Sequence, residues 1–215
     1  MSGPQTPTER FRAQLLEAFP AKAAELGWTE AALRAAAEEA GLSEGQGMMA
    51  APRGVIDLAD AFAARADETM LAAIAGFDLP SMKIREKVRE AVAARLEAQR
   101  GYKEAARAMT RALVRRPQEA ARLLWRTADH IWRAIGDTST DGNFYSKRAI
   151  LSGVLASTYA RWFSDSDEEM ADTLAFLDAR IENVMQFERF KAKRLTPLGG
   201  VAEDAVGFLA RLRYS

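Results

Sequence analysis

A possible metal-binding pattern begins at Asp137, in a polar segment between two apolar helical patterns. Asp137, Ser139 and Asp141 alternate along the chain and Gly142 follows, which is how a calcium-binding loop begins. The twelfth position of such a loop needs a bidentate Glu, and Arg148 stands there instead. Because a cation at that position repels calcium, we expect no metal site in this segment.

The same segment carries two adjacent aromatic residues, Phe144 and Tyr145. Its Thr, Ser, Asp and Gly residues are typical of a helix–helix connection, in which short polar side chains satisfy backbone groups. Aromatic residues have no such role in a polar turn, and they are enriched at protein–protein contacts. Residues 136–149 are therefore a candidate partner surface.

Catalysis has little support elsewhere in the chain. His130 is the single histidine, and there is no Glu-x-x-His pair, Gly-rich phosphate loop or Gly-x-Ser-x-Gly motif. Asp165, Asp167, Glu168 and Glu169 precede a predicted helix, where the helix dipole favours acids. We expect no catalytic residues, no enzyme activity and no catalytic cofactor.

The overall composition limits the classes of partner. Lys and Arg number 30, as do Asp and Glu, so the net charge is zero and broad electrostatic capture of nucleic acid is disfavoured. Without Cys the chain forms neither disulfides nor thiol metal sites. No run of 18 apolar residues exists, so the sequence predicts no membrane-spanning helix.

Helical periodicity extends over most of the chain, and the predicted fold class is all-α. Thr6 and Glu9 predict a capping box before the first helix, and Ser166 and Glu169 predict another before the last helix of the body. The predicted helices cover about residues 8–26, 29–40, 44–50, 55–77, 83–99, 104–114, 117–135 and 146–163, followed by one from about 167. The predicted domains are residues 8–52, residues 53–194, and a linker with a C-terminal helix at 195–215.

The N-terminal region has helix-turn-helix punctuation. Gly41 separates two short helical patterns, and Ser43 with Gln46 opens the second. This resembles the reading head of TetR-family repressors. The second helix would have to contact bases and phosphates, yet it contains Glu44, two glycines and no cation before Arg53. We expect no DNA binding, and a TetR-like repressor that responds to an apolar ligand is the alternative function.

Apolar and aromatic residues are concentrated in the second half of the chain. A packed core explains them, and a lipid cavity is the alternative, because bundle interiors are frequent ligand sites. The candidate lipid-binding residues are Leu124, Ile131, Trp132, Ile135, Leu151, Leu155, Tyr159, Trp162, Leu174, Leu177 and Ile181. In the terminal segment, Val201, Phe208, Leu209 and Leu212 lie on one helical stripe, which would pack on the body or contact a membrane.

Five stretches together resemble a known family: residues 82–88, 123–129, 131–132, 136–149 and 173–182. The family is the ninth of the Coq proteins, lipid-binding accessory factors of ubiquinone (coenzyme Q) biosynthesis. The resemblance implies a TetR-like fold that does not bind DNA, a hydrophobic lipid pocket, a C-terminal membrane helix and a homodimer. It also implies a bound isoprenoid quinone intermediate or phospholipid.

The resemblance further implies a contact with the demethoxyubiquinone hydroxylase. The positions that it assigns to this contact are Asp137, Asp141, Asn143, Phe144, Tyr145 and Arg148. Phe144 stands where the family usually has Trp, and Gly142 stands where Phe is frequent. Because the polar start of the chain is not Arg-rich, the expected location is the bacterial cytoplasm, at the periphery of the inner membrane.

Overall fold

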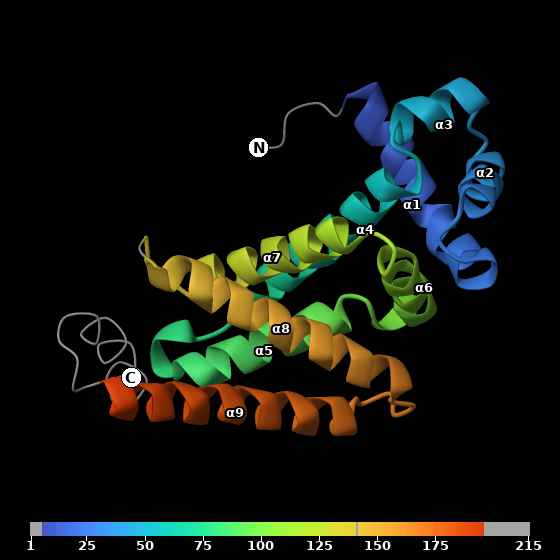
Figure 1. The fold of residues 1–215 in the computed structure, drawn as a ribbon. Coiled ribbons are helices and arrows are strands. Elements are labelled where there is room, and N and C mark those ends of the chain that lie inside the picture. Colours follow the sequence, from blue (N-terminus) through green and yellow to red (C-terminus); the bar gives the residue numbers. More distant parts are fainter. Residues whose placement is uncertain (1–5, 141, 196–215) are drawn as a thin grey trace. The chain divides into compact units, whose positions relative to one another are not determined.

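The computed structural model describes residues 6–140 and 142–195, and within these ranges the regular elements are all helical (Figure 1). This confirms the predicted all-α class for the part of the chain described. The α-helices are α1 (Pro7–Leu26), α2 (Glu30–Glu39), α3 (Glu44–Ala50), α4 (Val55–Ile74), α5 (Ile84–Glu97), α6 (Lys103–Leu113), α7 (Pro117–Ala134), α8 (Gly142–Ser164) and α9 (Ala171–Leu195). Two short 3-10 helices, η1 (Leu79–Ser81) and η2 (Arg100–Tyr102), precede α5 and α6.

The helices form two compact units that do not follow the chain order. Unit 1 contains residues 6–68 and 98–123, and unit 2 contains residues 69–97 and the described residues from 124 to 195. The long helices α4 and α7 each contribute one part to each unit. The predicted division at residue 52 groups the helices differently and stays a prediction.

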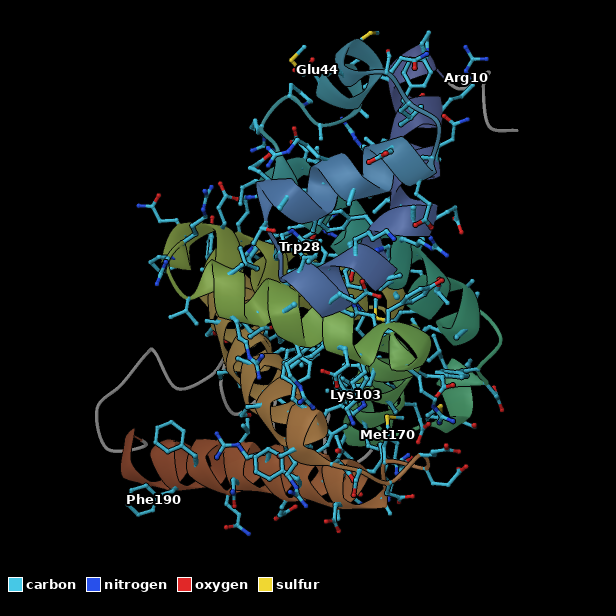
Figure 2. All side chains as sticks on the ribbon, turned by 90° about the vertical axis from the view of Figure 1, so that its right-hand side faces the viewer. Arg10, Trp28, Glu44, Lys103, Met170 and Phe190 are labelled. Carbon is cyan, nitrogen blue, oxygen red and sulfur yellow. The ribbon has the colours of Figure 1, made fainter. Side chains whose placement is uncertain are left out.

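Unit 1 is organised around α1, which contacts α2, α3 and α6. Its predicted capping box is confirmed, because Thr6 and Glu9 exchange backbone and side-chain hydrogen bonds at the N-terminus of α1. The ring of Trp28 lies edge-on to Phe19 and Phe62, at 4.7 and 5.5 Å between centroids. Its indole N–H donates to the Val55 carbonyl at 2.8 Å. Trp28 therefore joins α1, the start of α2 and α4 in one core (Figure 2).

The α2–α3 pair begins and ends as the sequence predicts. Gly41 adopts φ +66°, and the N–H groups of Gly41 and Leu42 donate to carbonyls in the last turn of α2. Ser43 and Gln46 form the predicted capping box of α3. A helix-turn-helix identity and a TetR-like arrangement stay predictions. Glu44 lies at the exposed start of α3 (Figure 2).

Unit 2 contains one apolar core built from α4, α5, α7, α8 and α9. Its fully or nearly fully buried members include Met70, Val92, Ile131, Leu155 and Leu177. Helix α9 contacts both α5 and α8, which places it along one side of this core (Figure 1). Burial of these side chains is the main stabilisation that the unit has, since each contributes about 1.5–3 kcal/mol.

The corner between α8 and α9 corrects one expectation. Helix α9 begins at Ala171, so the predicted capping box at Ser166 is wrong. Asp165 caps the helix instead: its carboxylate accepts from the Thr173 hydroxyl at 2.6 Å and from the Thr173 N–H at 2.9 Å. Asp167 accepts from the Ala171 N–H at 3.0 Å. These two acids stabilise the corner, as their position before a helix suggested.

The C-terminal predictions lie outside the described residues. They comprise the linker after Leu195 and the candidate membrane residues Val201, Phe208, Leu209 and Leu212. Among the helices that the structure does describe, none is long and apolar enough to span a bilayer.

Candidate functional site

The candidate partner surface is formed where α7 ends and α8 begins. Helix α7 ends at Ala134, and Gly136 just after it adopts φ +92°, a conformation that glycine reaches without steric cost. The Asp137 N–H donates to the Trp132 carbonyl at 2.9 Å, and the Gly136 N–H donates to the Arg133 carbonyl at 3.1 Å. This pair of bonds is a Schellman motif, and it turns the chain so that Asp137 faces α8.

Asp137 binds the first turns of α8 through its buried carboxylate, which is 6% exposed. Its Oδ1 accepts from Lys147 Nζ at 2.7 Å and from the Ser139 hydroxyl at 2.8 Å. Burial alone would raise the pKa of Asp137, but the hydrogen bonds from Lys147, Ser139 and Arg148 hold it below the ordinary value. The carboxylate therefore stays ionised and serves as an anchor.

Arg148 is the most deeply buried charged residue of the corner, with a side chain that is 1% exposed. Its Nε donates to Asp129 at 2.6 Å and its Nη1 donates to Asp137 at 3.3 Å. The same Nη1 donates to the carbonyl of Phe144 at 3.1 Å. Two carboxylates thus neutralise one guanidinium, which allows the charge to be buried.

The guanidinium of Arg148 also lies against the ring of Phe144, 3.5 Å from its centroid. Tyr145 is edge-on to Phe144 at 5.2 Å and tilted toward Trp125 at 6.2 Å. We call the residues Trp125, Phe144 and Tyr145 the aromatic corner. Tyr145 is 65% exposed, whereas Phe144 and Trp125 are half-buried. An exposed aromatic residue backed by a rigid pair is an arrangement that suits a protein contact.

A second connection holds α8 against α7. The indole N–H of Trp132 donates to the Lys147 carbonyl at 3.1 Å, and Lys147 Nζ lies 5.4 Å from the Trp132 ring. Trp132 itself belongs to the apolar core of unit 2. The aromatic corner is therefore attached to the core by hydrogen bonds and by packing.

The predicted partner residues lie partly in a helix and not only in a polar turn. Helix α8 begins at Gly142, about four residues before the predicted start, so Asn143, Phe144 and Tyr145 lie in its first turn. Arg148 and the Asp137 carboxylate face the interior of unit 2, where they position Phe144. Asp141 lies outside the described residues.

Sequence reasoning missed two members of this site, Asp129 and Trp125, which come from α7. Ser139 and Lys147 lie within the candidate segment 136–149, but no role was assigned to them individually. Their spacing along the sequence gives no periodic signal, because the contacts join two helices across a turn. Ile135-Gly136 was the available clue, since Gly just after an apolar helical pattern is typical of a helix end.

The candidate lipid residues lie mostly in the core of unit 2. Within that core, or packed against it, are Leu124, Ile131, Trp132, Ile135, Leu151, Leu155, Leu177 and Ile181. Tyr159 and Trp162 form a separate aromatic group with Phe163, and Arg95 donates to the Tyr159 hydroxyl at 2.9 Å. Leu174 is half-buried. Lipid binding by these residues stays a prediction.

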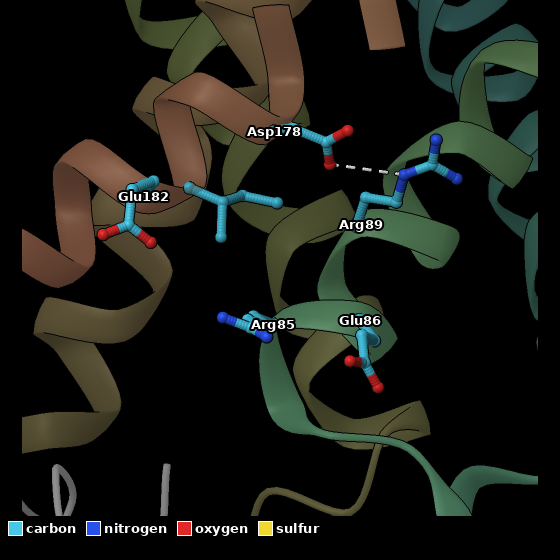
Figure 3. Close-up of a pocket in the computed structure, with 6 residues that line it drawn as sticks. Arg85, Glu86, Arg89, Asp178 and Glu182 are labelled. Atoms are coloured by element: carbon cyan, nitrogen blue, oxygen red, sulfur yellow. Dashed lines mark hydrogen bonds and ion pairs between the residues drawn. The ribbon is translucent and has the colours of Figure 1, made fainter. Parts of the chain in front are cut away.

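A cavity of about 210 Å³ lies between α5 and α9 in unit 2 (Figure 3). Its lining is charged except for one residue that also packs against the core: Arg85, Glu86, Arg89, Asp178, Ile181 and Glu182. Arg89 donates to Asp178 at 3.3 Å, and Figure 3 shows the Arg85 side chain reaching from α5 toward α9. Ile181 is the one apolar residue in this lining, so the cavity does not match the hydrophobic lipid pocket that the resemblance implies, and that pocket stays a prediction.

Metal chemistry finds no support in the described part of the chain, where no group of three His, Asp or Glu residues could hold an ion. Asp137, the first residue of the calcium-like spacing, instead binds Lys147 and Arg148. A carboxylate that is paired with two cations is a poor ligand for a further one.

The COQ9 family model matches residues 117–188, which run from the start of α7 into α9 and include the whole α7–α8 corner. This segment is similar to the COQ9 family. The resemblance predicted from the sequence is thereby confirmed for residues 117–188, which we call the COQ9 segment. The resembling stretch at residues 82–88 lies outside the match.

Curated relatives match this chain over 63 to 73 residues, a length similar to that of the COQ9 segment. The rat protein named ubiquinone biosynthesis protein COQ9, mitochondrial, is 41% identical over 63 residues, or 29% of this chain. The Xenopus laevis COQ9-A protein is 37% identical over 73 residues, or 34% of this chain, and the human protein is 36% identical over 63 residues. The matched part covers 20–23% of the length of these relatives.

Proposed function

We propose that this chain is a non-catalytic, lipid-binding accessory protein of ubiquinone biosynthesis. It presents polyprenylated quinone intermediates to the demethoxyubiquinone hydroxylase. The main support for this proposal is that the COQ9 segment includes the α7–α8 corner. In that corner, hydrogen bonds from Arg148 to Asp129 and to the Phe144 carbonyl hold the aromatic residues in place. The relatives are named as ubiquinone biosynthesis proteins, which supports the pathway.

In this proposal the aromatic corner contacts the hydroxylase. Tyr145 and Phe144 supply the apolar contact, and Arg148 and Asp137 hold Phe144 in place from behind. An isoprenoid or phospholipid chain occupies the apolar interior of unit 2 near the candidate lipid residues. Each buried methylene-sized group gains roughly 0.8 kcal/mol, so an isoprenoid tail needs an apolar site of this kind.

The proposal includes a homodimer and peripheral attachment to the bacterial inner membrane through the C-terminal stripe of Val201, Phe208, Leu209 and Leu212. Attachment would let a quinone move between bilayer and protein without crossing water. The relatives are named as mitochondrial proteins. In a bacterium, the inner membrane would take the place of the mitochondrial membrane in this proposal.

Mass spectrometry of an organic extract of the purified full chain tests the lipid part of the proposal. We expect an isoprenoid quinone intermediate or a phospholipid to be present in stoichiometric amounts. An extract without lipid from protein purified in the absence of detergent would reject lipid binding.

The alternative, a TetR-like repressor, is tested by a gel shift with DNA from upstream of the gene. Tight, sequence-specific and salt-sensitive binding would favour the repressor. The residues of α3 argue for the opposite result, because Glu44 stands at its start and Met48 and Met49 are 62% and 50% exposed.

A further inference from the structure

The region around the α6–α7 connection is rich in positive charge, although the net charge of the whole chain is zero. Residues 98–123 of unit 1 contain seven Lys and Arg residues and two acids, Glu104 and Glu119. Both acids are already used within their own helices, where Glu104 pairs with Arg107 and Glu119 pairs with Arg122. The segment also contains Arg111, Arg115 and Arg116, which are exposed to solvent.

Three of these cations lie close in sequence to one exposed apolar side chain. Arg111, Arg115 and Arg116 are exposed, and Val114 between them is 76% exposed. In the part of the chain that the structure describes, none of the three guanidinium groups makes an ion pair or a side-chain hydrogen bond. We call Arg111, Val114, Arg115 and Arg116 the basic corner.

Local helix electrostatics explain only one of the three arginines. Arg111 lies in the last turn of α6, where the helix dipole favours a cation. Arg115 and Arg116 directly precede Pro117, the first residue of α7, where the same dipole disfavours a cation. Arg107 and Arg111 are four residues apart within α6, and like charges at that spacing on a helix repel. Arg115 and Arg116 therefore stand at a helix start where an external anion would improve the local electrostatics.

From these features we propose that the basic corner docks on the surface of an anionic lipid bilayer, with lipid phosphates bound by the three guanidinium groups and Val114 at the level of the headgroups. The planar guanidinium binds phosphate in a bidentate manner, and basic residues next to an anionic leaflet attract it strongly. An apolar side chain among the cations is what an interfacial contact uses, since it enters the headgroup region.

This membrane contact lies in unit 1 and does not depend on the C-terminal stripe. To measure it separately, the full chain should carry Phe208→Glu, which weakens the contact expected from that stripe. The variant R111Q/R115Q/R116Q is then compared with R10Q/R34Q/K83Q in the same background. The control also removes three positive charges, from exposed side chains that form no ion pair in the described part of the chain.

The measurement is sedimentation with vesicles of phosphatidylcholine that contain about 30% phosphatidylglycerol, alongside vesicles of phosphatidylcholine alone. We expect the basic-corner variant to bind the anionic vesicles tenfold to 100-fold more weakly, on the order that three lipid-facing arginines contribute. The control should lose less than about threefold, and raising the salt concentration should abolish the difference between the two. Circular dichroism checks that both variants stay folded.

Equal losses in the two variants would overturn the proposal, because net charge and not the corner would then govern binding. Fluorescence anisotropy with a random-sequence DNA duplex provides the other contrary result. If the unmodified corner binds DNA more tightly than anionic vesicles and the R111Q/R115Q/R116Q variant loses that binding, nucleic acid phosphates are its partner. The lipid content of the purified protein should be the same in all variants, so failure here leaves the proposed function intact.

Discussion

The guanidinium of Arg148 lies 3.5 Å from the ring centroid of Phe144 and donates to the carbonyl of the same residue at 3.1 Å. Arg148 therefore fixes both the ring and the backbone of Phe144. Since Tyr145 follows directly and is 65% exposed, a buried charge determines how an exposed aromatic residue is presented. The two Asp partners of Arg148 come from α7 and from the turn after it, so the presentation depends on the packing of α7 and α8.

Removal of the buried guanidinium should destabilise unit 2 strongly. Arg148→Met leaves the carboxylates of Asp129 and Asp137 without this partner, and we expect a loss of about 3–5 kcal/mol in the free energy of unfolding. Urea denaturation followed by circular dichroism measures it. Arg133→Met is the matched control, because Arg133 pairs with the same Asp129 but is 67% exposed, and it should cost at most about 1 kcal/mol. Equal losses would show that Arg148 is no anchor.

Tyr145→Ala should separate partner binding from stability. Because the Tyr145 ring is mostly exposed, we expect its removal to change the unfolding free energy by less than about 1 kcal/mol. Binding to the purified hydroxylase, measured by calorimetry, should weaken at least tenfold, as for a contact residue that costs more than about 1.4 kcal/mol. Phe187→Ala removes an aromatic residue of α9 that is 63% exposed, and it should leave the affinity unchanged. The aromatic corner is not the contact if both variants bind equally well.

The pKa of Asp137 predicts how stability depends on pH. Burial would raise this pKa, but hydrogen bonds from Lys147, Ser139 and Arg148 lower it below the usual Asp value of about 3.9. The unfolded chain therefore binds more protons in acid, and the stabilisation is present at neutral pH and lost as the pH falls below about 4. We expect Asp137→Asn to show a smaller loss of unfolding free energy between about pH 5 and pH 3 than the unmodified protein. Parallel pH profiles would contradict this assignment.

Two glycine substitutions should have opposite effects on stability. Gly136→Ala places a side chain at φ +92° in the Schellman motif, and it should cost about 1–2 kcal/mol although nothing lies within 4 Å of the new Cβ. Gly153→Ala, which also has open space around it, lies inside α8 and should gain roughly 0.5–1 kcal/mol. Thermal unfolding compares the two, and a stabilising Gly136→Ala would mean that the turn after α7 tolerates another conformation.

The helices, unlike the site, follow closely from local sequence patterns. Side-chain caps at Thr6 and Ser43 act on amide groups two or three residues away, and both capping boxes are confirmed. The start of α9 was misplaced because Asp165 reaches Thr173, eight residues further along, which no capping pattern describes. Local rules therefore predict an element well when its cap is local.

The burial of Arg148 could not be predicted from the residues around it. It stands in a polar segment and looked like a surface cation, yet its partner Asp129 lies 19 residues earlier on another helix. The choice between a buried and an exposed arginine depends on that tertiary contact. The adjacent aromatic pair in a polar segment identified Phe144 and Tyr145 as candidates, and the family resemblance added the hydroxylase as their partner. The structure adds the residues that support them.

In the proposed function, this protein assists quinone hydroxylation through the aromatic corner. The rate at which the purified demethoxyubiquinone hydroxylase converts its quinone substrate in vesicles should therefore be measured with and without the full chain. We predict that the unmodified protein raises the rate, that Tyr145→Ala loses most of this increase, and that Phe187→Ala keeps it. A rate that is the same with and without the unmodified protein would contradict the account.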